Sequence, residues 1–215
     1  MEILQEMSTL LQAGRAKKVV ELVKQALVDG IAPQVIMEEG LLSGMAVIGE
    51  QFKNNEIYVP EVLIAARAMT MGMAELKDAL ARDGVQAKGT AVIGTVKGDL
   101  HDIGKNLVKM MLESKGLTVI DLGVDVSAEA FVEAAAANNA DVICCSALLT
   151  TTMGEMQRVV EVATEKGIRD QVKIMVGGAP VSESFRESIG ADIYTNDAAS
   201  AADAALQVCL ANHGA

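Results

Sequence analysis

The residues best suited to chemistry lie in a single loop, residues 94–104. His101, one of two histidines among 215 residues, follows Asp99 by two positions in the pattern Asp-x-His-x-x-Gly. A neutral imidazole is a good ligand for a transition metal, and its other ring nitrogen then needs an acceptor to fix tautomer and orientation. Asp99 is the obvious acceptor. A histidine in this pattern can also simply cap a helix or pack, so the pattern alone indicates either role.

This loop is expected at a turn between a strand and a helix. Residues 90–93 are an apolar run typical of a buried strand, and apolar residues in 103–112 have helical spacing. Open α/β sheets bind their ligands at such turns, outside the carboxyl ends of the strands.

Two further motifs follow strand-like runs. Ser146-Ala147-Leu148 follows the run 141–145, and Gly177-Gly178 closes the run 172–176. All three motifs should therefore lie at carboxyl ends of strands. For Gly177-Gly178 alone, an ordinary tight turn is the other interpretation.

Together, Asp-x-His-x-x-Gly, Ser-x-Leu and Gly-Gly at these spacings closely resemble the cobalamin-binding signature of corrinoid methyl-transfer proteins and methionine synthase. The resemblance implies cobalamin bound base-off, with its benzimidazole replaced on cobalt by His101 as metal ligand and Asp99 as its hydrogen-bonding partner. Thr152 matches a hydroxyl residue that ends this relay in methionine synthase. The cofactor-binding residues that it implies in this part of the chain are Gly98, Asp99, His101, Asp102, Ile103, Gly104, Ser146, Leu148, Thr150, Thr152, Gly177 and Gly178.

The displaced nucleotide tail needs a narrow apolar slot, which small residues can form. Gly98 and Gly104 let the backbone approach on one side, and Gly177-Gly178 on another. The family motif implies that Ser146 offers its hydroxyl to the tail and that Leu148 lines the wall.

The segment 52–62 resembles the helical cap that covers the upper corrin face in these proteins. By that resemblance Phe52, Val59 and Val62 shield the cobalt–carbon bond. All three can equally be core residues of a helical bundle.

An N-terminal helical cap domain is predicted for residues 1–82, because no convincing strand occurs there. Gly14 and Gly30 suit helix ends, while Pro33 and Pro60 suit first turns. Four helices with short connections favour an antiparallel bundle. They are predicted at residues 2–12, 15–28, 33–52 and 60–81.

After a polar linker, residues 83–89, strands and helices alternate through a predicted cobalamin-binding domain, residues 90–215. This pattern predicts an α/β fold with a doubly wound, five-stranded parallel sheet of the flavodoxin or Rossmann-like kind, in the order 2-1-3-4-5. The strands are predicted at 90–94, 117–121, 141–145, 172–176 and 192–195. The helices are predicted at 103–115, 128–138, 153–166, 183–188 and 198–211.

Composition narrows the functional classes. A net charge of −11 repels phosphate backbones and anionic lipids, so neither nucleic acid nor a membrane is an expected partner. The chain begins without the features of a signal peptide, which favours a cytoplasmic protein. Cys144, Cys145 and Cys209 form no metal-binding or disulfide pattern and are expected to be small buried hydrophobic residues.

The resemblance covers almost the whole chain and implies a corrinoid methyl carrier that is not a complete enzyme by itself. A partner methyltransferase specific for the substrate would deliver a methyl group to cobalt(I), giving methylcobalamin as intermediate. A second methyltransferase would pass it to a thiol or a folate, and a corrinoid reductive activator would restore cobalt(I). Methylamines are the favoured donors, followed by methanol and methoxyaromatics. The alternatives are a cobalamin-dependent sensor and regulator, or the small subunit of an adenosylcobalamin mutase.

Overall fold

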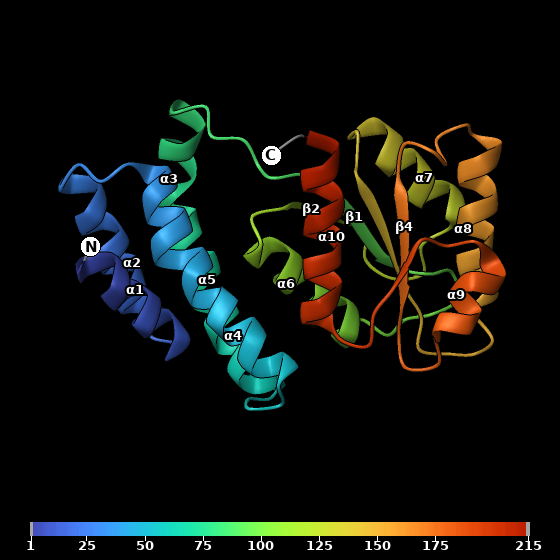
Figure 1. The fold of residues 1–215 in the computed structure, drawn as a ribbon, viewed down its shortest axis with the longest axis horizontal. Coiled ribbons are helices and arrows are strands. Elements are labelled where there is room, and N and C mark those ends of the chain that lie inside the picture. The colour runs from blue at the N-terminus through green and yellow to red at the C-terminus, as the bar shows by residue number, and fades with distance from the viewer. Residues whose placement is uncertain (1, 214–215) are drawn as a thin grey trace. The chain divides into compact units, whose positions relative to one another are not determined.

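The computed structural model describes residues 2–213. The chain forms two compact units, and the boundary between them along the sequence falls between Gln86 and Ala87 (Figure 1). This division falls within the segment 83–89, the expected linker. The first unit is helical, and the second combines helices with a parallel sheet. Within residues 2–213, no helix is both long enough and apolar enough to cross a bilayer.

The helical unit follows the predicted helices closely, with one difference. The helix expected at 33–52 is one continuous helical run whose middle part winds as a π-helix. Hydrophobic periodicity could not predict this change, since one wide turn leaves most apolar residues on the same face. The elements are α1 (Glu2–Gln12), α2 (Ala16–Val28), α3 (Pro33–Val35), η1 (Ile36–Leu42), α4 (Ser43–Lys53) and α5 (Val59–Arg82).

The core of the helical unit consists of side chains from its packed helices. Helix α2 packs along α5, and α1 packs on α2, η1 and α4. Fully buried side chains of Met7, Leu11, Leu41 and Met45 fill the space between them. Gly14 and Gly30 end their helices at positive φ, as predicted from the sequence.

The second unit confirms the predicted α/β fold. Its five strands are all parallel and lie in the order β2-β1-β3-β4-β5. Each boundary lies close to its predicted position. The strands are β1 (Thr90–Thr95), β2 (Thr118–Asp121), β3 (Val142–Ser146), β4 (Lys173–Gly177) and β5 (Ile193–Tyr194). The helices are α6 (Ile103–Ser114), α7 (Ala128–Ala137), α8 (Gly154–Glu165), α9 (Glu183–Ile189) and α10 (Ala198–His213).

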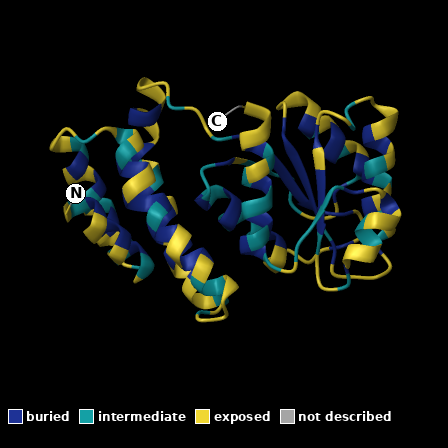
Figure 2. Cartoon of the chain, viewed as in Figure 1, coloured by how far each residue is buried: buried dark blue, intermediate teal, exposed yellow. Residues whose placement is uncertain are grey.

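Helices cover both faces of the sheet, which is why the central strands are apolar throughout. Helices α6 and α10 pack together on one face, and α7, α8 and α9 lie on the other (Figure 1). The central strands are buried, as Figure 2 shows. Phe131 of α7 is fully buried against the sheet. Gly94 in β1 makes room for it, because a Cβ at that position would come within 2.8 Å of the Phe131 ring.

This close fit gives a test of the packing. We expect Gly94→Ala to destabilise the protein by about 1–3 kcal/mol, because the added methyl group overpacks a filled core. Chemical denaturation measures the effect. Gly154→Ala is the matched control, since nothing lies near its Cβ position and its φ is ordinary. Equal stability of the two variants would contradict this account of the Phe131 contact.

Candidate functional site

The three sequence motifs meet at the carboxyl edge of the sheet. The strand register places Thr95 beside Ser146, and Ser146 beside Gly177. The loops that follow β1, β3 and β4 are therefore neighbours, because those strands are adjacent and parallel.

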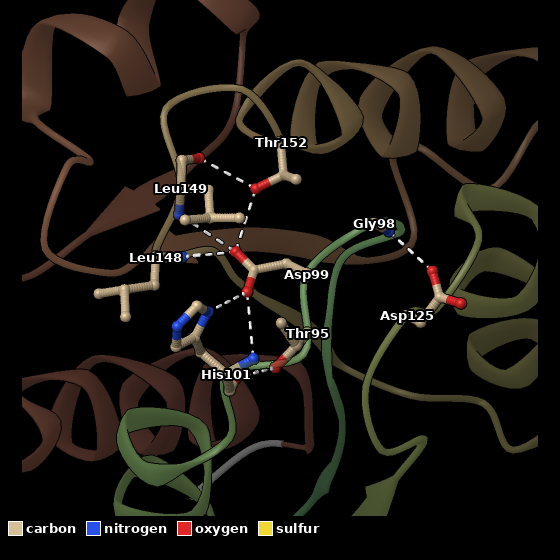
Figure 3. Close-up of polar contacts among 8 residues, drawn as sticks. All are labelled: Thr95, Gly98, Asp99, His101, Asp125, Leu148, Leu149 and Thr152. Atoms are coloured by element: carbon tan, nitrogen blue, oxygen red, sulfur yellow. Dashed lines mark hydrogen bonds and ion pairs between the residues drawn. The ribbon is translucent and has the colours of Figure 1, made fainter.

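The Asp99 carboxylate is the centre of this edge, and its side chain is 0% exposed. Its Oδ1 accepts hydrogen bonds from His101 Nδ1 at 2.7 Å and from the His101 backbone N–H at 3.1 Å. Its Oδ2 accepts bonds from the backbone N–H groups of Leu148 and Leu149, at 2.8 and 3.1 Å, and from Thr152 Oγ1 at 3.0 Å. Figure 3 shows these five donors converging on one carboxylate.

These contacts keep Asp99 ionised. Burial by itself raises the pKa of its carboxyl group, but hydrogen bonds from the His101 side chain and from backbone N–H groups outweigh burial and hold the pKa well below its usual range. An ionised carboxylate has no proton to donate, so His101 Nδ1 must carry the shared hydrogen. In the neutral ring, Nε2 is then the nitrogen with a free lone pair. The ring is half exposed, at 52%, so this nitrogen can meet a ligand.

Thr95 also positions His101, and the sequence reasoning missed it. Its hydroxyl, fully buried at the end of β1, donates to the His101 carbonyl oxygen at 2.8 Å. A hydroxyl at the end of an otherwise apolar buried strand was the available signal, since a buried hydroxyl needs a partner. His101 is thus held at its ring, its N–H and its carbonyl.

A buried ion pair fixes the helix that follows the histidine loop. Lys105, in the first turn of α6, is almost fully buried and donates to Asp121 Oδ1 at 2.6 Å. Asp121 ends β2 and also accepts a bond from the Gly123 N–H at 2.9 Å. The start of α6 is therefore tied to the neighbouring strand, and the sequence reasoning did not identify this pair either.

The four glycines expected at the site divide into two kinds. At Gly178, with φ +135°, a Cβ would overlap the Ala147 carbonyl oxygen, and Gly98, with φ +81°, adopts a conformation that other residues rarely take. These two glycines are required by the backbone. Gly104 and Gly177 instead face open space, with no atom within 4 Å of a Cβ position. They leave room that a ligand could occupy.

The remaining expected residues of this unit lie at the end of β3, in the loop that follows it, and at the start of α6. Ser146 is half-buried at the end of β3, whereas Leu148 and Thr150 are exposed in the following loop. Asp102 and Ile103 are exposed at the start of α6, and the Asp102 carboxylate accepts a bond from the Asn106 side chain at 3.1 Å. Exposed apolar side chains next to a polar centre suit a flat, largely apolar ligand.

The three expected cap residues belong to the other, helical unit. Phe52 and Val59 are half-buried, at the end of α4 and the start of α5. Val62 is fully buried. Its burial is what the bundle-core interpretation expected of this residue, while Phe52 and Val59 retain accessible surface.

The cysteines are buried thiols, as the sequence analysis expected. Cys144, Cys145 and Cys209 are all free and buried. Burial raises the pKa of Cys144 to about 12 and raises that of Cys145 as well. The pKa of Cys209 rises to about 12 through burial and the nearby Asp141 carboxylate. All three remain protonated at neutral pH and act as small apolar residues.

Comparison with known proteins identifies the class to which this fold and site belong. Residues 89–206 match a family model described as a B12 binding domain. Residues 3–77, in the helical unit, match a second model with the same description. The protein is thus of the B12-binding class, and both of its units carry that signature.

Individual relatives make the assignment specific. The dimethylamine corrinoid protein of Methanosarcina barkeri is 42% identical over 201 residues, which are 93% of this chain and 94% of the relative. Trimethylamine corrinoid protein 1 of Methanosarcina acetivorans is 45% identical over 180 residues, 83% of each chain. The chain belongs to the family of corrinoid proteins with B12-binding domains.

Solved structures agree with this assignment. A chain in the methanol:cobalamin methyltransferase complex MtaBC from Methanosarcina barkeri superposes with a TM-score of 0.87 at 30% identity, covering 97% of this chain and 80% of that one. The monomethylamine corrinoid protein of Methanosarcina barkeri gives a TM-score of 0.55 at 37% identity, covering 96% of this chain and 98% of that one.

The Asp99 network predicts how stability depends on pH. The folded-state pKa of Asp99 lies below the unfolded value of about 3.9. The stabilisation of the folded state by ionised Asp99 is therefore complete above that value, and it is lost as pH falls through the folded-state pKa. We expect the free energy of unfolding of the cofactor-free protein to fall between about pH 5 and pH 2, and Asp99→Asn to reduce that slope.

Urea denaturation at a series of pH values measures this slope. The Asp99→Asn variant should also be less stable at pH 7, because an amide group cannot accept from all five donors. Asp78→Asn, at an exposed position of α5, is the control and should keep the original slope. An unchanged slope in Asp99→Asn would show that Asp99 does not contribute to acid sensitivity.

Proposed function

We propose that this protein is a corrinoid methyl carrier, the cofactor-holding subunit of a methyltransferase system. One observation carries the proposal. The His101 ring is held through Nδ1 by a buried, ionised Asp99, so that Nε2 of this half-exposed ring is left free to meet a ligand. A neutral imidazole nitrogen of this kind would hold the metal of a bound cofactor.

The chain's residues fit the parts of a base-off cobalamin. His101 would hold the cobalt through Nε2, and Asp99 fixes the tautomer that makes this possible. Thr152 Oγ1 donates to the same carboxylate, as the relay implied by the resemblance requires. The donor set thus supports His101 as the lower metal ligand.

The nucleotide tail would enter the space beside Gly104 and Gly177. Ser146, between these two loops, would offer its hydroxyl to the tail, with Leu148 and Thr150 along the entrance. Gly98 and Gly178 have a different part in this proposal: they let the loops fold closely enough to form the walls. Asp102 and Ile103 would contact the cofactor from the start of α6.

The helical unit would serve as the cap. Phe52 and Val59 have accessible apolar surface that could cover the upper face of the cofactor. Val62 would support them from the core of the helical unit. An apolar cover keeps water away from a reactive reduced metal.

The bound cofactor supplies the methyl-transfer chemistry, through a cobalt centre that accepts a methyl group and gives it up again. A methyltransferase specific for the substrate is the first partner. The names of the relatives favour methylated amines as donors, and the methanol complex supports methanol as the next candidate. A second methyltransferase, transferring to a thiol or folate, and a reductive activator complete the proposed set of partners.

Cobalamin uptake tests the tail site. The cofactor-free protein should bind one cobalamin per chain, and Gly177→Leu should abolish binding because the leucine side chain fills the open space. Absorbance after gel filtration measures uptake, and circular dichroism checks the fold. Lys173→Leu, at the exposed start of the same strand, should bind normally. Normal uptake by Gly177→Leu would exclude the tail from this position.

The absorption spectrum tests the lower ligand. His101→Ala should still retain cobalamin through the buried tail, but it should show a base-off spectrum at neutral pH. The matched control is His213→Ala, which removes the only other histidine and should keep the nitrogen-ligated spectrum. A nitrogen-ligated spectrum in His101→Ala would mean that another group holds the cobalt.

A further inference from the structure

A second loop holds the backbone on which Asp99 and His101 are carried. Residues 122–126, which follow β2, run beside the loop after β1. The Thr95 N–H donates to the Gly123 carbonyl, and the Val126 N–H donates to the Thr95 carbonyl, both at 2.9 Å. Val96 and Val126 form a parallel bridge. The two loops therefore extend the pairing of their strands past the end of the sheet.

Within this loop, Asp125 makes the contacts that lie closest to Asp99 and His101. Its Oδ1 accepts a hydrogen bond from the Gly98 N–H at 2.7 Å, as drawn in Figure 3. Its own N–H donates to the Asp99 carbonyl oxygen at 3.0 Å. The two bonds hold the Lys97–Gly98 and Asp99–Leu100 peptide groups, which flank the Gly98–Asp99 segment, so that this segment has limited freedom.

The backbone of Asp125 adopts an unfavourable conformation when it makes these two hydrogen bonds. Asp125 has φ +56°, in the left-handed region, although its side chain is exposed and the residue is not glycine. Such a conformation is unfavourable for most residues other than glycine, and aspartate and asparagine are among those that tolerate it best. The two hydrogen bonds to Gly98 and Asp99 are what this conformation makes possible.

We propose that Asp125 is a positioning residue for the Asp99–His101 pair. It acts through the Gly98–Asp99 backbone and determines how firmly the His101 ring is directed at its ligand. The inference rests on the proposed function. The side chain of Asp99 is held by the loop after β3, and its backbone is held by Asp125, so the carboxylate keeps its direction towards His101 only while both loops hold it.

Three substitutions separate the possible roles of Asp125. Asp125→Asn keeps an oxygen acceptor and tolerates positive φ. Asp125→Gly makes the positive φ favourable but removes the hydrogen-bond acceptor. Asp125→Ala removes the acceptor and keeps the unfavourable positive φ. Asn139→Ala is the control for placing alanine at a positive φ. Asn139 is also exposed, has φ +48° and lies at the other edge of the sheet, just before β3.

The first measurement uses the cofactor-free protein, so it does not depend on the proposed function. Hydrogen exchange by NMR should show a protected Gly98 amide in the original protein, in Asp125→Asn and in Asn139→Ala. In Asp125→Ala and Asp125→Gly, exchange of this amide should be faster, and the His101 Nδ1–H signal should broaden. Unchanged exchange and an unchanged ring signal in these two variants would overturn the proposal.

The second measurement uses the protein loaded with cobalamin. All variants should take up one cofactor per chain, but Asp125→Ala and Asp125→Gly should show a smaller nitrogen-ligated fraction in their spectra. We expect a shift near the lower end of the roughly 10- to 100-fold range seen for outer-shell residues of metal sites. A full nitrogen-ligated spectrum in both variants, or its loss in Asp125→Asn, would overturn a positioning role through this hydrogen bond. Failure of the original protein to bind cobalamin would instead refute the proposed function and leave the NMR test standing.

Discussion

The site depends on one buried negative charge. A carboxylate removed from water is strongly destabilising unless hydrogen-bond donors replace its hydration. Asp99 obtains those donors from its own loop and from residues 148–152, which follow a different strand. The requirement to satisfy Asp99 therefore fixes the loops after β1 and β3 against each other. His101 benefits because its ring is one of the donors and cannot turn away without leaving Oδ1 with one fewer bond.

Much of the fold could be predicted because its signals are local. Apolar runs such as residues 90–93 predict buried strands, and alternation with helices predicts a parallel sheet and its usual strand order. The π-helical turns of η1 could not be predicted in this way. Neither could the shortness of β5, since the length of Ile193–Tyr194 depends on pairing with β4 alone.

The site was predictable where the chemistry is carried by residue type. Asp99, His101 and Thr152 are found by pattern and resemblance, and the structure brings all three into one network. Lys105 and Asp125 were missed because their partners are distant in sequence. Thr95 was missed although its buried hydroxyl gave a signal, because the path of the loop back to the His101 carbonyl is not visible in the sequence. The glycines illustrate the same limit. Sequence treats Gly177 and Gly178 alike, while only Gly178 has its Cβ position taken by the backbone of another loop.

The anchoring of His101 at ring, N–H and carbonyl has an entropic consequence. A flexible side chain that becomes fixed on binding typically subtracts about 0.5–1.5 kcal/mol from affinity. Here the imidazole gives up its rotational freedom when the chain folds. Under the proposed function, Nε2 would therefore meet the metal in a fixed orientation, and the side chain would lose little further freedom when the bond forms.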